Sequence, residues 1–228
     1  MPKLLLLRQI RGCLPGLRII LPRALPGWVT NWIQFVLPGA ELDIYDERTE
    51  YLQCEALLMP TLLMHPEHFL HPTLGTLLDE LVHETAGEVV KRQNIYVSRV
   101  APSWFRKLSN QVDVEEIAVQ EGLTLLKPET LSLAEQIKAF ASADVIVGEF
   151  GSAMHNALFS SPQTKVFCLN WINGMQSRIA QLRRHRVGYL LPSDGPPIKY
   201  VAGSAQTSYC IDSALFRRCL RALTYAHE

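Results

Sequence analysis

The stretch Val145–Phe159, VIVGEFGSAMHNALF, decides the fold that we predict for this chain. Its β-branched start favours a buried strand, and the residues after Gly151 have the apolar spacing of a helix that Ser152 would cap. A strand that passes through glycines into a helix leaves unpaired backbone N–H groups and a positive dipole end at the turn. Gly148 and Gly151 would let a ligand approach the backbone, and a phosphate suits such a turn. An ordinary tight turn is the alternative.

From about Asn94 onward, short apolar runs alternate with helical patterns. In chain order these segments are IYVSR, VDVEEIAVQEG, LTLLKP, LSLAEQIKAFAS, DVIVG, SAMHNALFS, KVFCL and MQSRIAQLRRHR. The alternation predicts an α/β fold with a parallel sheet of five or more strands and helices on both faces. We expect the strand ends at Arg99, Pro128 and Gly148 to share one edge. The S-x-x-E pattern of Ser132–Glu135 predicts a capping box.

The residues before Asn94 are less regular. KLLLLR, LRIILP and ELDIYD have the composition of strands, whereas Trp28–Val36 and Thr73–Thr85 have that of helices. We therefore predict a partial N-terminal α/β lobe over residues 1–90 and a Rossmann-like lobe over residues 91–228. The boundary is expected near residues 86–93.

The composition is that of an ordinary globular protein, with 48% hydrophobic and 19% charged residues. Lys plus Arg and Asp plus Glu both total 22, so no net field favours a nucleic-acid partner. The five cysteines form no C-x-x-C pair, which suits free thiols in a reducing compartment. The four-leucine run near the start is interrupted by Arg8, too early for an export signal. We expect a cytoplasmic protein.

Several cations follow the first strand of the regular half. Arg99 ends IYVSR, and Arg106 and Lys107 lie close behind, so they are expected at the same edge as the glycine turn. This combination would suit a diphosphate, with a solvated surface arginine as the alternative. The chain has no G-x-G-x-x-G after a strand, no G-x-x-x-x-G-K-[ST] and no D-x-D pair, so we expect no nicotinamide, P-loop or metal site.

Three segments carry a family resemblance: IYVSR, KPETLSLAEQIKAFASADVIVGEFGSAMHNALF and KVFCLNWIN. In this order, from Asn94 to about Pro192, they resemble glycosyltransferase family 61, the capsular-polysaccharide type. The resemblance extends weakly back to Leu17 and leaves the last 36 residues uncovered. It implies a GT-B architecture of two Rossmann-like lobes, with the N-terminal lobe on the acceptor side and the C-terminal lobe binding the nucleotide sugar.

The resemblance also implies roles for individual residues. Those matched to the donor diphosphate are Arg99, Arg106, Asn110, Gly151, Ser152, Ala153 and Asn156. Those placed beside the nucleoside are Pro128, Glu129, Ser132, Gln136 and Gly148, with Glu129 able to accept from ribose hydroxyls. Glu149 and Phe150 stand where Pro-His is common in the family, and Gln111 stands where Glu is usual.

The implied activity is inverting, metal-independent transfer of a hexosyl or pentosyl unit from a UDP-sugar to a hydroxyl of a glycan or lipid-linked acceptor. This would serve capsular polysaccharide or exopolysaccharide assembly. The first 90 residues are short for an acceptor lobe, so we expect either a shortened member or fragment, or a lobe helped by another subunit. The alternative function is a nucleotide-binding module that no longer transfers sugar.

The residues alone leave the general base open, and the candidates are His65, Glu67 and Glu149. His65, His68 and His71 invite a zinc site, but prolines interrupt any helix that would align them, so a surface loop is the commoner reading. His155 is expected to be a packed histidine. Two arginine-rich helical segments, QSRIAQLRRHR and SALFRRCLRALTYA, suggest either a solvated face or contact with the inner face of the membrane.

Overall fold

The computed structural model describes residues 2–61, 63–64, 69–88, 92–99, 106–172, 174–193 and 207–224. Its contacts divide the chain into two compact units, Met1–Leu78 and Asp79–Glu228. The division falls inside helix α3 (Pro72–Ala86), ahead of the stretch 86–93. Helix α3 confirms the helix predicted over Thr73–Thr85. All five cysteines are free thiols, as expected.

The first unit contains a two-stranded parallel sheet, in which helix α2 (Gly27–Val36) connects β1 (Arg18–Pro22) to β2 (Glu41–Tyr45). These elements confirm the strand, helix and strand predicted for this part. Arg18 on β1 donates two hydrogen bonds to Asp43 on β2, at 2.6 and 2.5 Å, and also pairs with Glu41. This ion cluster stabilises the pairing of the two strands only modestly, because its members are solvent-exposed.

The strand predicted for KLLLLR is wrong, because Pro2–Ile10 forms helix α1, followed by the 3-10 turn η1 (Arg11–Cys13). Leucine has a high helix propensity, and a short apolar run has no period that separates a strand from a buried helix. Leu5 of α1 and Ile33 of α2 are buried, and the two helices are in contact. Packing against α2 therefore decides the structure of this run.

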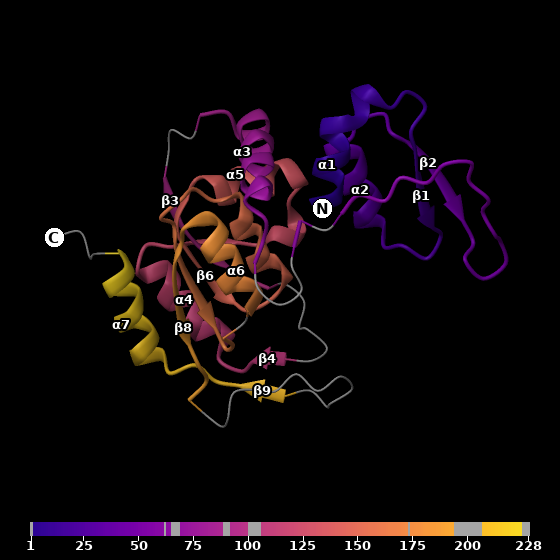
Figure 1. Ribbon diagram of the computed structural model, residues 1–228. Helices are drawn as coiled ribbons and strands as arrows, with labels where there is room; N and C mark the ends of the chain where they lie inside the picture. The colour runs from indigo at the N-terminus through magenta and orange to yellow at the C-terminus, as the bar shows by residue number, and fades with distance from the viewer. Residues whose placement is uncertain are drawn as a thin grey trace. The chain divides into compact units, whose positions relative to one another are not determined.

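The second unit is built on a five-stranded parallel sheet, which confirms the predicted fold class (Figure 1). Its strands are β3 (Gln93–Val97), β5 (Thr124–Leu126), β6 (Ala143–Glu149), β7 (Lys165–Leu169) and β8 (Arg186–Leu190). The spatial order is β5-β3-β6-β7-β8. The strand that follows β3 in the chain, β5, lies on one side of it, and the later strands lie on the other side, beginning with β6. The direction of winding therefore changes between β3 and β6, which is the switch point of the sheet. Ligands of open α/β sheets bind outside the carboxyl ends of the strands at such a point.

The register confirms that the predicted strand ends share one edge. Val97, the last residue of β3, is opposite Leu126 on β5 and Gly148 on β6. The residues that follow these strands, among them Arg99 and Pro128, are thus at the carboxyl edge of the sheet.

Helices cover both faces of this sheet, as predicted. One face is covered by α4 (Gln111–Gln120) and α7 (Ser213–Thr224), which share a core with Tyr96, Val147 and Leu169 of the strands. The other helices are α5 (Leu133–Ala141), η3 (Ser152–Phe159) and α6 (Gly174–Arg183), and both α5 and α6 pack against η3. The capping box of α5 is confirmed, because Ser132 and Glu135 exchange both hydrogen bonds.

A second pairing, which the sequence did not predict, joins β4 (Arg106–Leu108) to β9 (Thr207–Tyr209) in parallel. Figure 1 shows these two short strands side by side, although about a hundred residues separate them in the chain. The pairing brings Tyr209 and the start of α7 to the part of the chain that follows β3.

Candidate functional site

The centre of the candidate site is the contact between Arg99 and Gly151 at the switch point. Arg99 follows β3, and Gly151 follows β6. A Cβ atom added to Gly151 would lie 2.5 Å from Nη2 of Arg99 and 3.1 Å from its Cζ. The φ angle of Gly151 is 173°, an extended value that any residue adopts, so backbone conformation does not require glycine here. The Arg99 guanidinium does, because it occupies the space that a side chain would need. The structure thus brings together the cation and the glycine turn that the sequence analysis paired.

The strand end that carries Arg99 is held by the first turn of α4. Gln111 donates one hydrogen bond to the backbone carbonyl of Arg99, at 3.0 Å, and another to Oε1 of Glu115, at 2.7 Å. Ser98 also donates to Oε1 of Glu115, at 2.7 Å. A carboxylate at position 111 could not donate to a carbonyl, so the amide of Gln111 is needed for this geometry.

A buried acidic group lies next to this site. Glu149, at the end of β6, is only 7% exposed, and its Oε2 accepts a hydrogen bond from the hydroxyl of Tyr209. Burial, followed by the charge of Glu149, raises the pKa of Tyr209, and the charge of Arg99 opposes this shift. Burial and Glu149 also raise the pKa of Tyr96. Tyr209 is therefore a neutral phenol that donates to the Glu149 carboxylate.

Protein atoms fill the space beside Gly148, and its contact with a nucleoside stays a prediction. An added Cβ at this position would lie 2.8 Å from Sδ of Met154 and 3.0 Å from both Cβ and the carbonyl oxygen of Val97. Met154 belongs to η3 and is fully buried. The absent side chain of Gly148 thus makes room for protein atoms, so packing accounts for this glycine without a ligand.

The segment after Gly151 differs from the expected helix. It is the 3-10 helix η3, its N-cap is Gly151, and no side chain caps it, so the expectation that Ser152 caps the helix is wrong. Ser152 is exposed, and the amide of Met154 donates to the carbonyl of Gly151 at 3.0 Å. The first N–H groups of this helix, those of Ser152 and Ala153, have no acceptor within it. They remain available as donors beside Arg99.

Three predicted ligand residues make hydrogen bonds to the protein itself. Asn110 donates to the carbonyl of Ile211 at 2.8 Å and accepts from its amide at 3.2 Å. Asn156 donates to Oε1 of Gln136 at 2.9 Å. Asn110 therefore anchors the segment before α7, and Asn156 and Gln136 join η3 to α5. Their contact with a donor remains a prediction.

The remaining predicted residues are only partly described. Pro128 is buried and Glu129 is exposed in the 3-10 turn η2 (Pro128–Thr130), while Ser132 is engaged in its capping box. His65 and Glu67 lie outside the described residues, as does the side chain of Arg106. Within the described ranges, no group of three or more His, Cys, Asp or Glu could hold a metal ion.

The sequence analysis missed several buried polar atoms of η3, α6 and the residue after β7. Among the described residues, Oδ1 of Asn170, both amide atoms of Gln176 and Nε2 of His155 are buried without a hydrogen-bond partner. Asn170 is 1% exposed and Gln176 is 0% exposed. Each such group costs about 1–3 kcal/mol when unpaired, so each calls for a partner. An asparagine directly after a buried strand is the signal that could have revealed Asn170.

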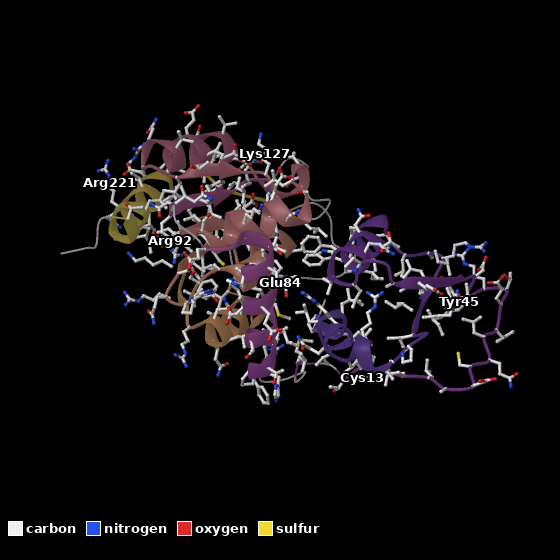
Figure 2. The ribbon with its side chains drawn as sticks, turned by 90° about the horizontal axis from the view of Figure 1, so that it is seen from above. Cys13, Tyr45, Glu84, Arg92, Lys127 and Arg221 are labelled. Carbon is white, nitrogen blue, oxygen red and sulfur yellow. The ribbon has the colours of Figure 1, made fainter. Side chains whose placement is uncertain are left out.

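Two of the three arginines of α7, Arg217 and Arg221, make intramolecular contacts. Arg221, labelled in Figure 2, and Arg217 both pair with Glu121, at 3.0 and 2.9 Å. Hydrogen bonds from Arg221, then from Arg217, lower the pKa of Glu121. No helix in the described part of the chain is long and apolar enough to cross a membrane.

A parallel sheet with an arginine, a glycine and free helix-terminal N–H groups at its switch point defines an α/β protein suited to a phosphorylated ligand. The model of the family Glycosyltransferase 61 matches residues 1–167 of this chain. The chain belongs to that family, which confirms the resemblance and implies glycosyltransferase activity. The comparison with curated proteins finds no matching sequence.

Proposed function

We propose that this chain is an inverting glycosyltransferase that binds a nucleotide-diphosphate sugar, a UDP-sugar, and transfers the hexosyl or pentosyl unit to a glycan hydroxyl. The observation that carries the proposal is the position of Arg99 over Gly151 at the sheet's switch point. A guanidinium donates in a planar fork that fits phosphate oxygens, and it sits beside the open N-terminus of η3. This arrangement offers both charge and hydrogen bonds to a diphosphate.

The same groups would assist the chemistry. In inverting transfer the acceptor oxygen bonds to the anomeric carbon opposite the diphosphate, and its proton passes to the general base. The bond from the anomeric carbon to the diphosphate breaks, and negative charge grows on the leaving diphosphate. Fixed donors aimed at that charge stabilise it in the transition state. Arg99 and the N–H groups of Ser152 and Ala153 are the donors that we assign to this role, without a metal ion.

The surroundings of the site complete the proposal. We propose a GT-B-like arrangement in which the first unit serves the acceptor, a polysaccharide or lipid-linked glycan of capsule or exopolysaccharide assembly. We place the reaction in the cytoplasm, where UDP-sugars are available. The general base stays open among His65, Glu67 and Glu149, and Tyr209 holds the last of these as a hydrogen-bond acceptor.

A binding panel tests the proposal. Thermal unfolding of the purified chain would be followed with UDP, uridine and UDP-linked hexoses, N-acetylhexosamines and pentoses. A ligand that binds only the native state raises the midpoint by mass action, so UDP and one class of UDP-sugar should raise it more than uridine. Release of UDP with a polysaccharide acceptor would establish transfer. Binding without release would favour the nucleotide-binding module, and no shift with any nucleotide would contradict both.

A further inference from the structure

Unpaired amide atoms of Asn170 and Gln176 follow β7, the strand beside β6 in the sheet, and the proposed diphosphate site does not use them. We propose that Asn170 and Gln176 hydrogen-bond the hydroxyl groups of the donor's glycosyl unit. This inference rests on the proposed function and adds the place where the sugar is recognised. It concerns the connection between β7 and α6, outside the residues that the sequence analysis assigned to the donor.

The position of β7 in the sheet supports this assignment. The Arg99–Gly151 contact spans the ends of β3 and β6, and β7 is the next strand after β6, on the side away from β3. Asn170 follows the last residue of β7 directly. Neighbouring strands are about 4.8 Å apart, so the end of β7 is one strand spacing from the end of β6. The nucleoside is expected on the opposite side, near the end of β5.

The chemistry of these amides suits an uncharged polyol. Asn170 and Gln176 are neutral amides, and a primary amide both donates and accepts, as a sugar hydroxyl does. Charged ligands would require a buried counter-charge, and the unpaired atoms here belong to amides and one imidazole. The ring of Phe150, after β6, lies 6.2 Å from that of Trp171, which directly follows Asn170, and 6.0 Å from that of His155.

The backbone around these amides is fixed. Asn170 has φ 83°, a left-handed value that asparagine tolerates better than most residues, and its N–H donates to Leu190 of β8 at 2.8 Å. Gln176 lies in the first turn of α6 and shares its buried face with Ile179, Ala180 and Arg183. Both amides thus project from positions that packing and register hold in place, as sugar recognition requires.

The test separates recognition of the sugar from recognition of the nucleotide. Gln176→Met keeps the length of the side chain, and Asn170→Gly keeps the left-handed backbone, while each removes an amide. Gln181→Met is the matched control, because Gln181 is an exposed residue of the same helix. Calorimetry would give the affinity of each variant for UDP and for the UDP-sugar that shifts the wild type most in the panel.

We expect Gln176→Met and Asn170→Gly each to weaken UDP-sugar binding about tenfold, with UDP affinity unchanged within about twofold. The control should change neither. Thermal stability of Gln176→Met should not fall, because an unpaired buried amide is replaced by an apolar group of similar shape.

Equal weakening of UDP and UDP-sugar, or no weakening of either, would overturn the inference while leaving the proposed function intact. A lower unfolding midpoint of Gln176→Met with unchanged sugar affinity would mean that internal water satisfies the amide, and would also overturn it. If the wild type bound neither UDP nor any UDP-sugar, both proposals would fall together.

Discussion

The two edges of the five-stranded sheet both bury polar side chains, but they satisfy them differently. At the amino edge, Arg183 donates to the carbonyl of Ser160 at 3.1 and 2.8 Å and pairs with Asp79 at 2.7 Å. Thr164 there donates to the carbonyl of Ala143 at 3.0 Å. At the carboxyl edge, the amides of Asn170 and Gln176 contain unpaired atoms. Nδ1 of His185 is also unpaired at the amino edge, and Glu149 is paired at the carboxyl edge, so the contrast lies between the paired guanidinium of Arg183 and the unpaired amide atoms that we assign to a ligand.

The largest expected effect is a loss of unfolding free energy when Arg183, at the amino edge, is replaced. Arg183→Met keeps the aliphatic stem but leaves the carbonyl of Ser160 and the carboxylate of Asp79 without their donor. Arg183 is 4% exposed, and hydrogen bonds from a buried charge are strong, so we expect a loss of about 2–4 kcal/mol in unfolding free energy. Urea titration measures it. A variant as stable as the wild type would contradict the structural role of this edge.

Replacing Arg99, the arginine at the carboxyl edge, should weaken UDP binding. Arg99→Ala should weaken UDP by about 1.5–3 kcal/mol, roughly 10- to 150-fold, while unfolding free energy stays within about half a kcal/mol. Uridine, which has no phosphate, should be affected far less. Calorimetry with both ligands checks this. If UDP affinity held within about twofold, or uridine weakened equally, the diphosphate would have to be placed elsewhere.

Protonation of His185, at the amino edge, should also lower the stability of the protein. Burial, then the charge of Arg183, lowers the pKa of His185 to about 4, and the backbone of Ser161 and Ser160 opposes this only in part. Because the unfolded histidine binds a proton near pH 6.5, stability is present above that pH and falls as the pH drops toward 4. By pH 5 the loss should be about 2 kcal/mol.

Comparing the wild type with His185→Gln separates the contribution of this histidine to the pH dependence of stability from that of the other titrating groups. Denaturant titrations of both proteins at pH 7 and pH 5 give the two pH dependences. The variant should lose about 2 kcal/mol less than the wild type on acidification. Parallel losses would show that His185 titrates normally in the folded protein.

The two glycines at the end of β6 offer a smaller contrast within the carboxyl edge. Gly148→Ala would press on the backbone of Val97 and on buried Met154, so we expect a loss of about 1–2 kcal/mol in stability. Gly151→Ala would meet only the flexible end of Arg99, so its stability should stay within about half a kcal/mol while UDP binding weakens. Thermal unfolding and calorimetry distinguish these outcomes. The opposite pattern would mean that Gly148 faces the ligand.

The smallest expected effect is that of chelation. Because Arg99 and the start of η3 supply positive charge at the proposed diphosphate site, UDP affinity should be the same with and without EDTA. Calorimetry in the two buffers tests this. Affinity lost in EDTA and restored by manganese would show that a metal ion is part of the site.

Local patterns predicted most of the fold. The strands around Ile95, Ile146 and Val166 are continuous apolar runs between helical segments, and Ser132 with Glu135 forms the expected capping box. The strand predicted for the run after Lys3 was wrong, because leucines alone have no period that favours a strand over a helix. The 3-10 form of η3 also has no signal in its sequence, since packing around Met154 decides it.

The candidate site was predictable only where its residues follow strands. Arg99 and Gly151 could be paired because parallel strands end at one edge. Tyr209 could not be found, because its contact with Glu149 joins residues sixty positions apart through a short strand. The hydrogen bonds between the side chain of Asn110 and the backbone of Ile211 are likewise long-range contacts that no local sequence pattern predicts.

The return of residues 207–213 to the carboxyl edge has a consequence for the order in which the protein is synthesised. Tyr209 donates to Glu149, Ser109 donates to the carbonyl of Tyr209, and Asn110 holds Ile211. While the chain emerges from the ribosome, β3, β6 and β7 can pair before any of these later residues exist. Glu149 then remains hydrated, and the edge that we assign to the donor becomes complete only after residues 207–213 have been made.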